Sequence, residues 1–165
     1  MLDLFRYRVT EPEFNHLSAL DRQMQSSNYS IRSEKSLPKP FVLILGRDND
    51  TRFLFKTAFE LWNYEVAEAC NAEQSLGVCT FKNPDLVLMD TEFEMESSLT
   101  AMKQMRGSKL FTNCGFILVS GHAQENIRRT ALAAGADFFL VKPIDFEILR
   151  KFLWIYFKDR RLAIS

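Results

Sequence analysis

Short runs of consecutive apolar residues recur through this 165-residue chain and constrain its fold more than any other feature. They cover residues 41–45, 86–89, 115–119 and 138–141. A run without polar alternation is typical of a strand that is buried on both faces of a parallel sheet. Residues 64–69 alternate between apolar and polar side chains, which indicates a strand nearer the edge. The chain is therefore predicted to form a sheet of five strands.

Helices are expected between and after these strands. The expected ranges are 50–63, 71 to a point before Pro84, 98–106, 125–134 and 146–158. We expect Asp50 to cap the first helix, with Leu54, Ala58 and Leu61 on its inner face. Strands that alternate with helices predict the α/β class, as a doubly wound parallel sheet with right-handed crossovers. The functional side chains of such a sheet lie at the carboxyl ends of its strands.

The first forty residues differ from the rest in composition. Phe14, Leu17, Leu20 and Met24 recur at helical spacing and predict one short amphipathic helix. The stretch after it, up to residue 40, is rich in serine and ends in two prolines, which is typical of a linker. The predicted organisation is an N-terminal extension over residues 1–40, a domain over residues 41–158 and a C-terminal tail over residues 159–165.

Charge and cysteine content exclude several classes of protein. The chain has 21 Lys and Arg residues against 21 Asp and Glu residues, and this balance argues against a nucleic-acid partner. Cys70, Cys79 and Cys114 lie far apart without metal-ligand spacing, so we expect buried or half-buried thiols rather than disulfides or a zinc site. The sequence shows neither a membrane-spanning apolar run nor a signal peptide. We therefore expect a cytoplasmic protein with no membrane partner.

Three of the predicted strands end on residues with charged or hydroxyl side chains that could take part in a reaction. Asp90 follows the third strand, Ser120 the fourth and Lys142 the fifth. Since all three positions meet at one edge of the sheet, a carboxylate, a hydroxyl and an ammonium group should converge there. This set suits phosphoryl transfer onto the carboxylate, with the other two groups holding the added oxygens.

Residues 84–90, 117–121 and 134–143, read together, resemble the receiver domain of bacterial two-component response regulators. The resemblance covers about residues 41–155 and implies a flavodoxin-like sheet with strand order 2-1-3-4-5. It also implies that Asp90 is the phospho-acceptor, Ser120 the switch hydroxyl and Lys142 the lysine that contacts the phosphoryl group. Phe139 falls at the family's switch aromatic, and a cis peptide bond is expected before Pro143. A purely structural Asp90–Lys142 ion pair is the alternative interpretation.

The end of the first strand departs from the family pattern. Receivers usually have two acidic residues there that hold Mg²⁺, whereas this chain has Gly46 and Arg47. Arg52 stands six residues after Gly46, which is the spacing the family shows between the first acid and a basic residue. The loop after the acceptor departs as well, since Glu94 and Ser98 occupy positions at which relatives have proline and glycine.

These substitutions change the expected charge of the site. Asp90, Lys142 and Arg47 sum to +1, or to zero if Asp48 turns inward, whereas the usual receiver pocket sums to −2. Bringing a divalent cation next to this charge is unfavourable. Mg²⁺ is therefore a doubtful cofactor, with Asp48, Asp90 and Glu92 as its only candidate ligands. Arg47 is expected to substitute for the charge of the metal, by pairing with Asp90 or with a phosphoryl group.

Two functions remain open at this point. The first is a single-domain response regulator that receives a phosphoryl group on Asp90 from a histidine kinase or a phosphotransfer protein and then docks to a downstream protein target. The second is a pseudo-receiver, an interaction module that acts without phosphorylation. An enzyme is not expected, because no Ser/His or Cys/His pairing is present. Apolar residues on more than one face of the last helix, Phe146, Leu149, Leu153, Tyr156, Phe152, Trp154 and Ile155, make a homodimer through this helix a further possibility.

Overall fold

The structure is a computed structural model that describes residues 38–91 and 95–162. The strands are β1 Phe41–Leu45, β2 Glu65–Ala69, β3 Leu86–Asp90, β4 Gly115–Ser120 and β5 Phe138–Val141. The helices are α2 Asn49–Leu61, α3 Ala72–Cys79, α4 Met95–Gly107, α5 Glu125–Ala133 and α6 Phe146–Leu162, with a 3₁₀ turn η1 at Lys109–Phe111. The predicted N-terminal helix, the predicted linker up to residue 37, and residues 92–94, which include Glu92 and Glu94, lie outside the described residues.

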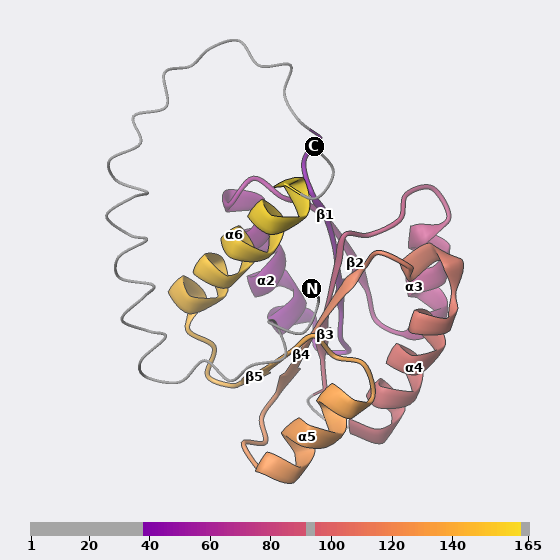
Figure 1. Ribbon diagram of the computed structural model, residues 1–165, viewed down its shortest axis with the longest axis vertical. Helices are drawn as coiled ribbons and strands as arrows, with labels where there is room; N and C mark the ends of the chain where they lie inside the picture. The colour runs from indigo at the N-terminus through magenta and orange to yellow at the C-terminus, as the bar shows by residue number, and fades with distance from the viewer. Residues whose placement is uncertain (1–37, 92–94, 163–165) are drawn as a thin grey trace. The chain divides into compact units, whose positions relative to one another are not determined.

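The five strands form one parallel sheet in the order β2-β1-β3-β4-β5 (Figure 1). β1 pairs with β2 on one side and with β3 on the other, so that Leu43 lies opposite both Ala67 and Val87. This order confirms the predicted doubly wound, flavodoxin-like topology. The order of the strands reverses beside β1, and the carboxyl ends of β1 and β3 are adjacent there.

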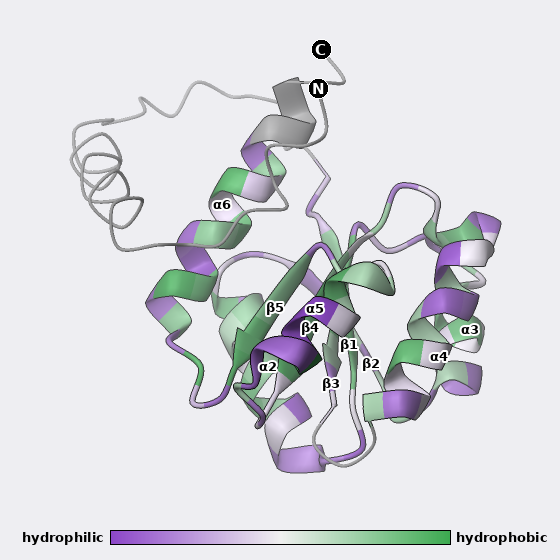
Figure 2. Cartoon of the chain, turned by 60° about the horizontal axis from the view of Figure 1, so that its bottom comes forward, coloured by the Kyte–Doolittle hydropathy of each residue, from purple (hydrophilic) through white to green (hydrophobic). Residues whose placement is uncertain are grey.

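Two apolar cores fill the space between the sheet and its helices. On one face, α2 and α6 pack through Phe55, Phe59, Leu149 and Leu153. On the other face, α3, α4 and α5 cover the sheet, with Met102 among the side chains that are fully buried. Figure 2 shows the hydrophobic colour concentrated on the strands between these helices. The continuous apolar runs therefore form strands that are buried on both faces, as the sequence predicts.

The inner face of α2 differs from the prediction. The buried residues are Phe55 and Phe59, whereas Leu54 is 53% and Leu61 is 80% exposed. The first residue of the helix is also different, because the side chain of Asp48 rather than that of Asp50 caps it. Apolar residues occur all around this helix, and the side that faces the sheet and α6 carries Phe55 and Phe59, whereas Phe53 is 69% exposed.

Two other helices differ from the prediction in length. α4 begins at Met95 rather than at residue 98, and α6 continues to Leu162 rather than ending at residue 158. Cys79 and Cys114 are buried as expected, whereas Cys70 is exposed. Burial raises the pKa of the Cys79 thiol to about 11, which keeps this thiol protonated and unreactive. No helix in the described part of the chain has the length and apolar character needed to cross a bilayer.

The side chain of Arg106 connects α4 with the start of β4 and with the turn between α5 and β5. Arg106, near the end of α4, donates hydrogen bonds to the carbonyl oxygens of Cys114 at 2.8 Å and of Gly135 at 2.9 Å. Its guanidinium also pairs with Asp137 at 2.5 Å and lies 4.4 Å from the centre of the Phe116 ring. Asp137 in turn accepts a hydrogen bond of 2.8 Å from the backbone of Phe116. These contacts fix α4 and the α5–β5 turn against the start of β4.

Candidate functional site

Asp90 and Lys142 meet at the carboxyl edge of the sheet. Nζ of Lys142 donates a hydrogen bond of 2.9 Å to Oδ2 of Asp90. The side chain of Asp90 is 3% exposed and that of Lys142 is 21% exposed. The two residues are 52 positions apart in sequence, and the adjacent ends of β3, β4 and β5 bring them together. The carboxylate and the ammonium group predicted at the strand ends thus converge on one site.

Ser120 occupies the strand between them. It is fully buried, and its Oγ accepts a hydrogen bond of 3.1 Å from the backbone N–H of His122. Its carbonyl oxygen accepts a hydrogen bond of 2.8 Å from the backbone N–H of Lys142, which fixes the end of β5 against the end of β4. The Ser120 hydroxyl is therefore held in a local turn at the same edge of the sheet. His122 itself is exposed.

The β1–α2 turn, residues 46–48, is fixed by Arg52. Nη1 of Arg52 donates hydrogen bonds to the carbonyl oxygens of Gly46 at 2.5 Å and of Arg47 at 2.9 Å, and Nε lies 3.6 Å from Glu68. A Cβ atom added at Gly46 would lie only 3.0 Å from Cβ of Asp90. The first of the two positions that are acidic in receivers therefore faces Asp90 directly and has no side chain here.

Asp48 serves the helix next to the site. Its Oδ2 accepts a hydrogen bond of 2.6 Å from the backbone N–H of Thr51, which is the usual geometry of a helix N-cap. The hydrogen bonds from Thr51, with smaller contributions from the charges of Lys142 and Arg52, lower the pKa of this carboxyl below its ordinary value of 3.8. Asp48 thus remains ionised at neutral pH, with one oxygen committed to the start of α2.

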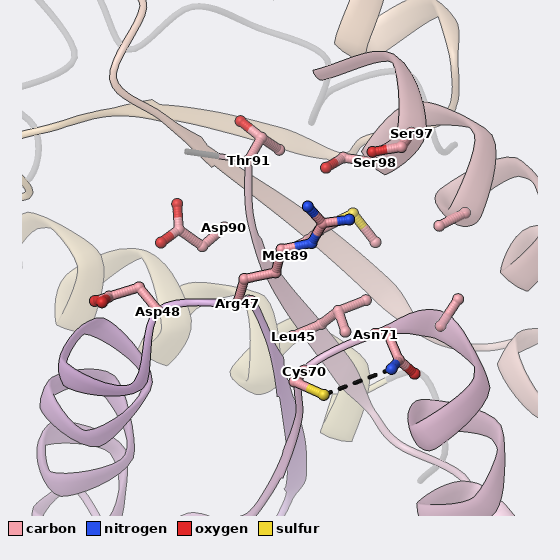
Figure 3. A pocket seen from close by; sticks show the side chains of 13 residues that line it. Leu45, Arg47, Asp48, Cys70, Asn71, Met89, Asp90, Thr91, Ser97 and Ser98 are labelled. Atoms are coloured by element: carbon pink, nitrogen blue, oxygen red, sulfur yellow. Dashed lines mark hydrogen bonds between the residues drawn. The ribbon is translucent and has the colours of Figure 1, made fainter. Parts of the chain in front are cut away.

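A cavity of about 190 Å³ opens beside Asp90, between the ends of β1 and β3 and the first residues of α3 and α4. Arg47 lines it, together with Asn71 and Ser98. Figure 3 shows that the Arg47 guanidinium extends toward Ser98, whereas the carboxylate of Asp90 points to the opposite side. The predicted residues are thus close together, but the guanidinium and the carboxylate occupy different halves of the site.

Two features implied by the family resemblance lie on the far edge of the sheet. The peptide bond between Lys142 and Pro143 is cis, as expected. Phe139, on β5, is half-buried and packs against the core under α3, α4 and α5. It is therefore close to the surface of the edge strand.

The described residues do not supply a ligand set for a metal ion. Among residues 38–91 and 95–162, no three His, Cys, Asp or Glu side chains form a group that could hold a cation. Asp90 pairs with an ammonium group and Asp48 caps a helix. Glu92, the third candidate, lies outside the described residues. Since Mg²⁺ needs several oxygen ligands in near-octahedral geometry, this set does not fit the ion.

Sequence reasoning missed part of the site. Thr91 is buried, and its Oγ1 donates a hydrogen bond of 2.9 Å to the carbonyl oxygen of Val119, which joins the ends of β3 and β4. Asn71 and Ser98 line the cavity although no motif marks them. Their placement depends on where α3 and α4 begin, and apolar periodicity does not fix a helix start to one residue.

Comparison with known proteins places the chain in one family. The model of the response regulator receiver domain matches residues 42–153. Regulatory protein AtoC of Escherichia coli is 31% identical over 108 residues, which cover 66% of this chain and 23% of that protein. Sporulation initiation phosphotransferase F of Bacillus subtilis is 25% identical over 109 residues, which cover 66% of this chain and 86% of that protein.

Solved structures show the same fold. A response regulator from Thermotoga maritima superposes with a TM-score of 0.65 at 23% identity, over 72% of this chain and 98% of that one. Chemotaxis response regulator CheY4 of Vibrio cholerae gives a TM-score of 0.64 at 19% identity, over 72% of this chain and 99% of that one.

The match to longer relatives is confined to one of their parts. The chain spans 23% to 44% of the length of AtoC, of the PhoB regulator of Pseudomonas aeruginosa and of the APRR3 protein of Arabidopsis thaliana. Receiver domains are signalling modules of two-component systems and are generally not enzymes. With its sheet order and its match over residues 42–153, this chain belongs to the family of response regulator receiver domains.

Proposed function

We propose that this chain receives a phosphoryl group on Asp90 and passes the signal on by docking to a protein partner. The observation that carries the proposal is the placement of a carboxylate at the end of β3 with the Lys142 ammonium 2.9 Å away. A lysine in this position neutralises the acceptor and can then bind a phosphoryl oxygen. The phosphoryl donor is a phosphohistidine on a histidine kinase or on a phosphotransfer protein.

The transfer exchanges one bond to phosphorus for another. An oxygen of Asp90 attacks the phosphorus, a P–O bond forms, and the P–N bond to the donor imidazole breaks. The ring nitrogen keeps the electron pair of the broken bond, and Asp90 becomes an acyl phosphate. Lys142 then holds one oxygen of the added group, and the Ser120 hydroxyl donates to another once it leaves its turn with the His122 N–H, which is now 3.1 Å from Oγ.

Signalling follows from this rearrangement at the edge of the sheet. Movement of Ser120 opens space beside β5, and the half-buried ring of Phe139 turns into it. The surface around β5 and α6 changes as a result, and a downstream target binds to this changed surface. The same surface is where two copies would meet if the protein forms a homodimer through α6.

Metal binding is weakened or absent in this proposal. Gly46 and Arg47 replace the acidic pair, and the formal charge around Asp90 is neutral to positive. Bringing Mg²⁺ next to the positive charges of this site is electrostatically unfavourable. In a receiver with three carboxylates, the attraction between those carboxylates and the cation makes binding favourable. The Arg47 charge takes over part of the role of the cation, and phosphoryl transfer then proceeds without dependence on the metal.

Phosphotransfer assays test this proposal. The protein is incubated with radiolabelled acetyl phosphate, and separately with a phosphorylated histidine phosphotransfer domain, in Mg²⁺ and in EDTA. We expect acid-stable, base-labile label on the wild-type protein in both buffers and none on the Asp90→Asn variant. Label that requires Mg²⁺ would overturn the charge argument. The absence of label from every donor would overturn phosphoryl transfer itself.

A pseudo-receiver is the second candidate, and the same substitutions support it. Gly46 and Arg47 remove the metal ligands of the family, and Asp90 is 3% exposed in its ion pair. An acceptor that stays locked to Lys142 would serve only the fold, and the surface around β5 would bind its partner in one permanent state. The Asp90→Asn variant separates the two functions, because partner binding and behaviour in the cell stay unchanged in a pseudo-receiver and change in a phosphorelay protein.

A further inference from the structure

We infer that Arg52 is a positioning residue for the reaction at Asp90, because its guanidinium holds the β1–α2 turn, residues 46–48, in place against the acceptor. The inference rests on the proposed function, since it concerns the acceptor of that reaction. In the family pattern this turn carries two acidic residues that hold a metal ion, and here neither position is acidic. A cation that belongs to the chain itself orders the turn instead.

The turn lies directly beside Asp90 (Figure 3). β1 and β3 pair up to Leu45 and Met89, so that Gly46 and Asp90 come next at the ends of the two strands. A Cβ atom at Gly46 would lie 3.0 Å from Cβ and 3.9 Å from Cγ of Asp90. Since the Asp90 side chain is 3% exposed, the backbone of the turn forms part of the wall around it. A displacement of this backbone therefore changes the space in which the carboxylate attacks a phosphorus atom.

The guanidinium of Arg52 binds three oxygens of the turn and of the first residue of α2. Nη1 donates to the carbonyl oxygens of Gly46 at 2.5 Å and of Arg47 at 2.9 Å, and Nη2 donates to Oδ1 of Asn49. Carbonyl oxygens that converge on one positive group resemble the oxygen ligands of a metal ion. The guanidinium is planar and stays protonated in proteins, so its geometry and its charge are constant.

A carboxylate on β2 holds the same guanidinium from the other side. Nε of Arg52 lies 3.6 Å from Oε1 of Glu68, and the Arg52 side chain is 13% exposed. Low exposure reduces screening by water, so the attraction between the guanidinium and the carbonyl oxygens is stronger than at an open surface. Lys56, one turn further along α2, pairs with Oε2 of Glu68 at 2.9 Å. Within the described part of the chain Lys56 binds no oxygen of the turn, which makes it a matched control.

Labelling kinetics with acetyl phosphate in EDTA test the inference. We expect Arg52→Met to lower the maximal rate of Asp90 labelling about tenfold or more, because a displaced acceptor site loses alignment with the donor. The acetyl phosphate concentration that gives half of this rate should stay within about twofold, because Arg52 holds the turn and not the donor. Arg52→Lys should recover part of the rate, since an ammonium group can bind one of the two carbonyl oxygens. Lys56→Met should leave both quantities unchanged.

Hydrogen exchange followed by NMR gives a second readout that needs no phosphoryl donor. The backbone N–H of Gly46 donates to the carbonyl oxygen of Ala69 at 3.1 Å, and Leu43 lies in the fully buried middle of β1. In Arg52→Met we expect exchange at Gly46 to become about tenfold faster or more, with exchange at Leu43 unchanged. Lys56→Met should change neither amide.

The two measurements separate positioning of the turn from a general structural role. An undiminished maximal rate in Arg52→Met overturns the inference, and so does an equal loss in Lys56→Met. A change confined to the half-saturating concentration overturns it as well, because Arg52 would then act on the donor. Unchanged exchange at Gly46 in Arg52→Met, or equally faster exchange at Gly46 and Leu43, also overturns it. If no donor labels the wild-type protein, the proposed function fails, whereas the exchange data still decide whether Arg52 holds the turn.

Discussion

The side chain of Asp90 is a nearly buried anion, and the stability of the folded protein depends on its neutralisation by the charge of Lys142. Removing the lysine in Lys142→Met leaves a carboxylate that is 3% exposed without the ammonium group that neutralises it. Breaking a fully buried pair in this way costs about 3–5 kcal/mol, and we expect about 3 kcal/mol here because Lys142 retains some contact with water. Urea unfolding measures the loss. Asp90→Asn should cost less, since the remaining ammonium can turn toward solvent, and a larger loss in Asp90→Asn would contradict this account.

The side chain of Asp48 makes a pH-dependent contribution to the free energy of unfolding. Its hydrogen bonds with Thr51 lower the pKa of the folded state below 3.8, so the charged cap stabilises the fold above pH 3.8. The contribution is lost as the pH falls through the lowered pKa. Asp48→Asn keeps a neutral cap that does not titrate. We expect the wild-type protein to have the higher urea midpoint at pH 7 and this difference to shrink below pH 4. A difference that is constant from pH 7 to pH 2.5 would refute the prediction.

The positions of some side chains in the site can be predicted from the sequence, and those of others cannot. Asp90 and Lys142 were placed together because parallel strands end at one edge, which requires only the strand positions. The direction of the Arg47 side chain could not be predicted in the same way. It depends on the turn that Arg52 fixes through two carbonyl oxygens. The local sequence pattern predicts which residue ends a strand. The direction of the next side chain is instead determined by hydrogen bonds to the backbone of the turn that follows.

At the scale of elements, the contact between α6 and the start of β4 depends on a glycine. A Cβ atom at Gly115 would lie 2.2 Å from the hydroxyl oxygen and 2.6 Å from Cζ of Tyr156. Gly115→Ala should therefore displace the Tyr156 ring from its place against β4 and destabilise the protein by about 1–3 kcal/mol, as overpacking does. Calorimetry or urea unfolding measures this loss. Gly115→Ala combined with Tyr156→Leu should cost less than the sum of the single changes, whereas simple additivity would rule out the clash.

The strands could be predicted closely, and the helices could be predicted less well. A buried strand is marked by its own continuous apolar run, as in residues 86–89. On α2 the apolar residues surround the helix, so Leu54 and Leu61 satisfy helical periodicity as well as Phe55 and Phe59 do. Shape complementarity with the sheet and with α6 selects the phenylalanines. The Arg106–Asp137 pair spans 31 residues and has no local pattern that could announce it.

For the whole molecule, the described core is complete without the first 38 residues. All five strands and both apolar cores lie between Phe41 and Phe157, and residues Lys39–Ser165 form a compact unit by themselves. A chain that begins at Lys39 should therefore unfold in one cooperative step, with a free energy of unfolding within about 0.5 kcal/mol of that of the full chain. Urea unfolding followed by fluorescence and by circular dichroism compares the two chains. The slope of the transition scales with the surface that unfolding exposes, and it should be similar in both, because that surface belongs mainly to the sheet and its helices. A loss of several kcal/mol in the shorter chain would show instead that the leading segment contributes to the fold, and the receiver domain would then have to be redefined to include it.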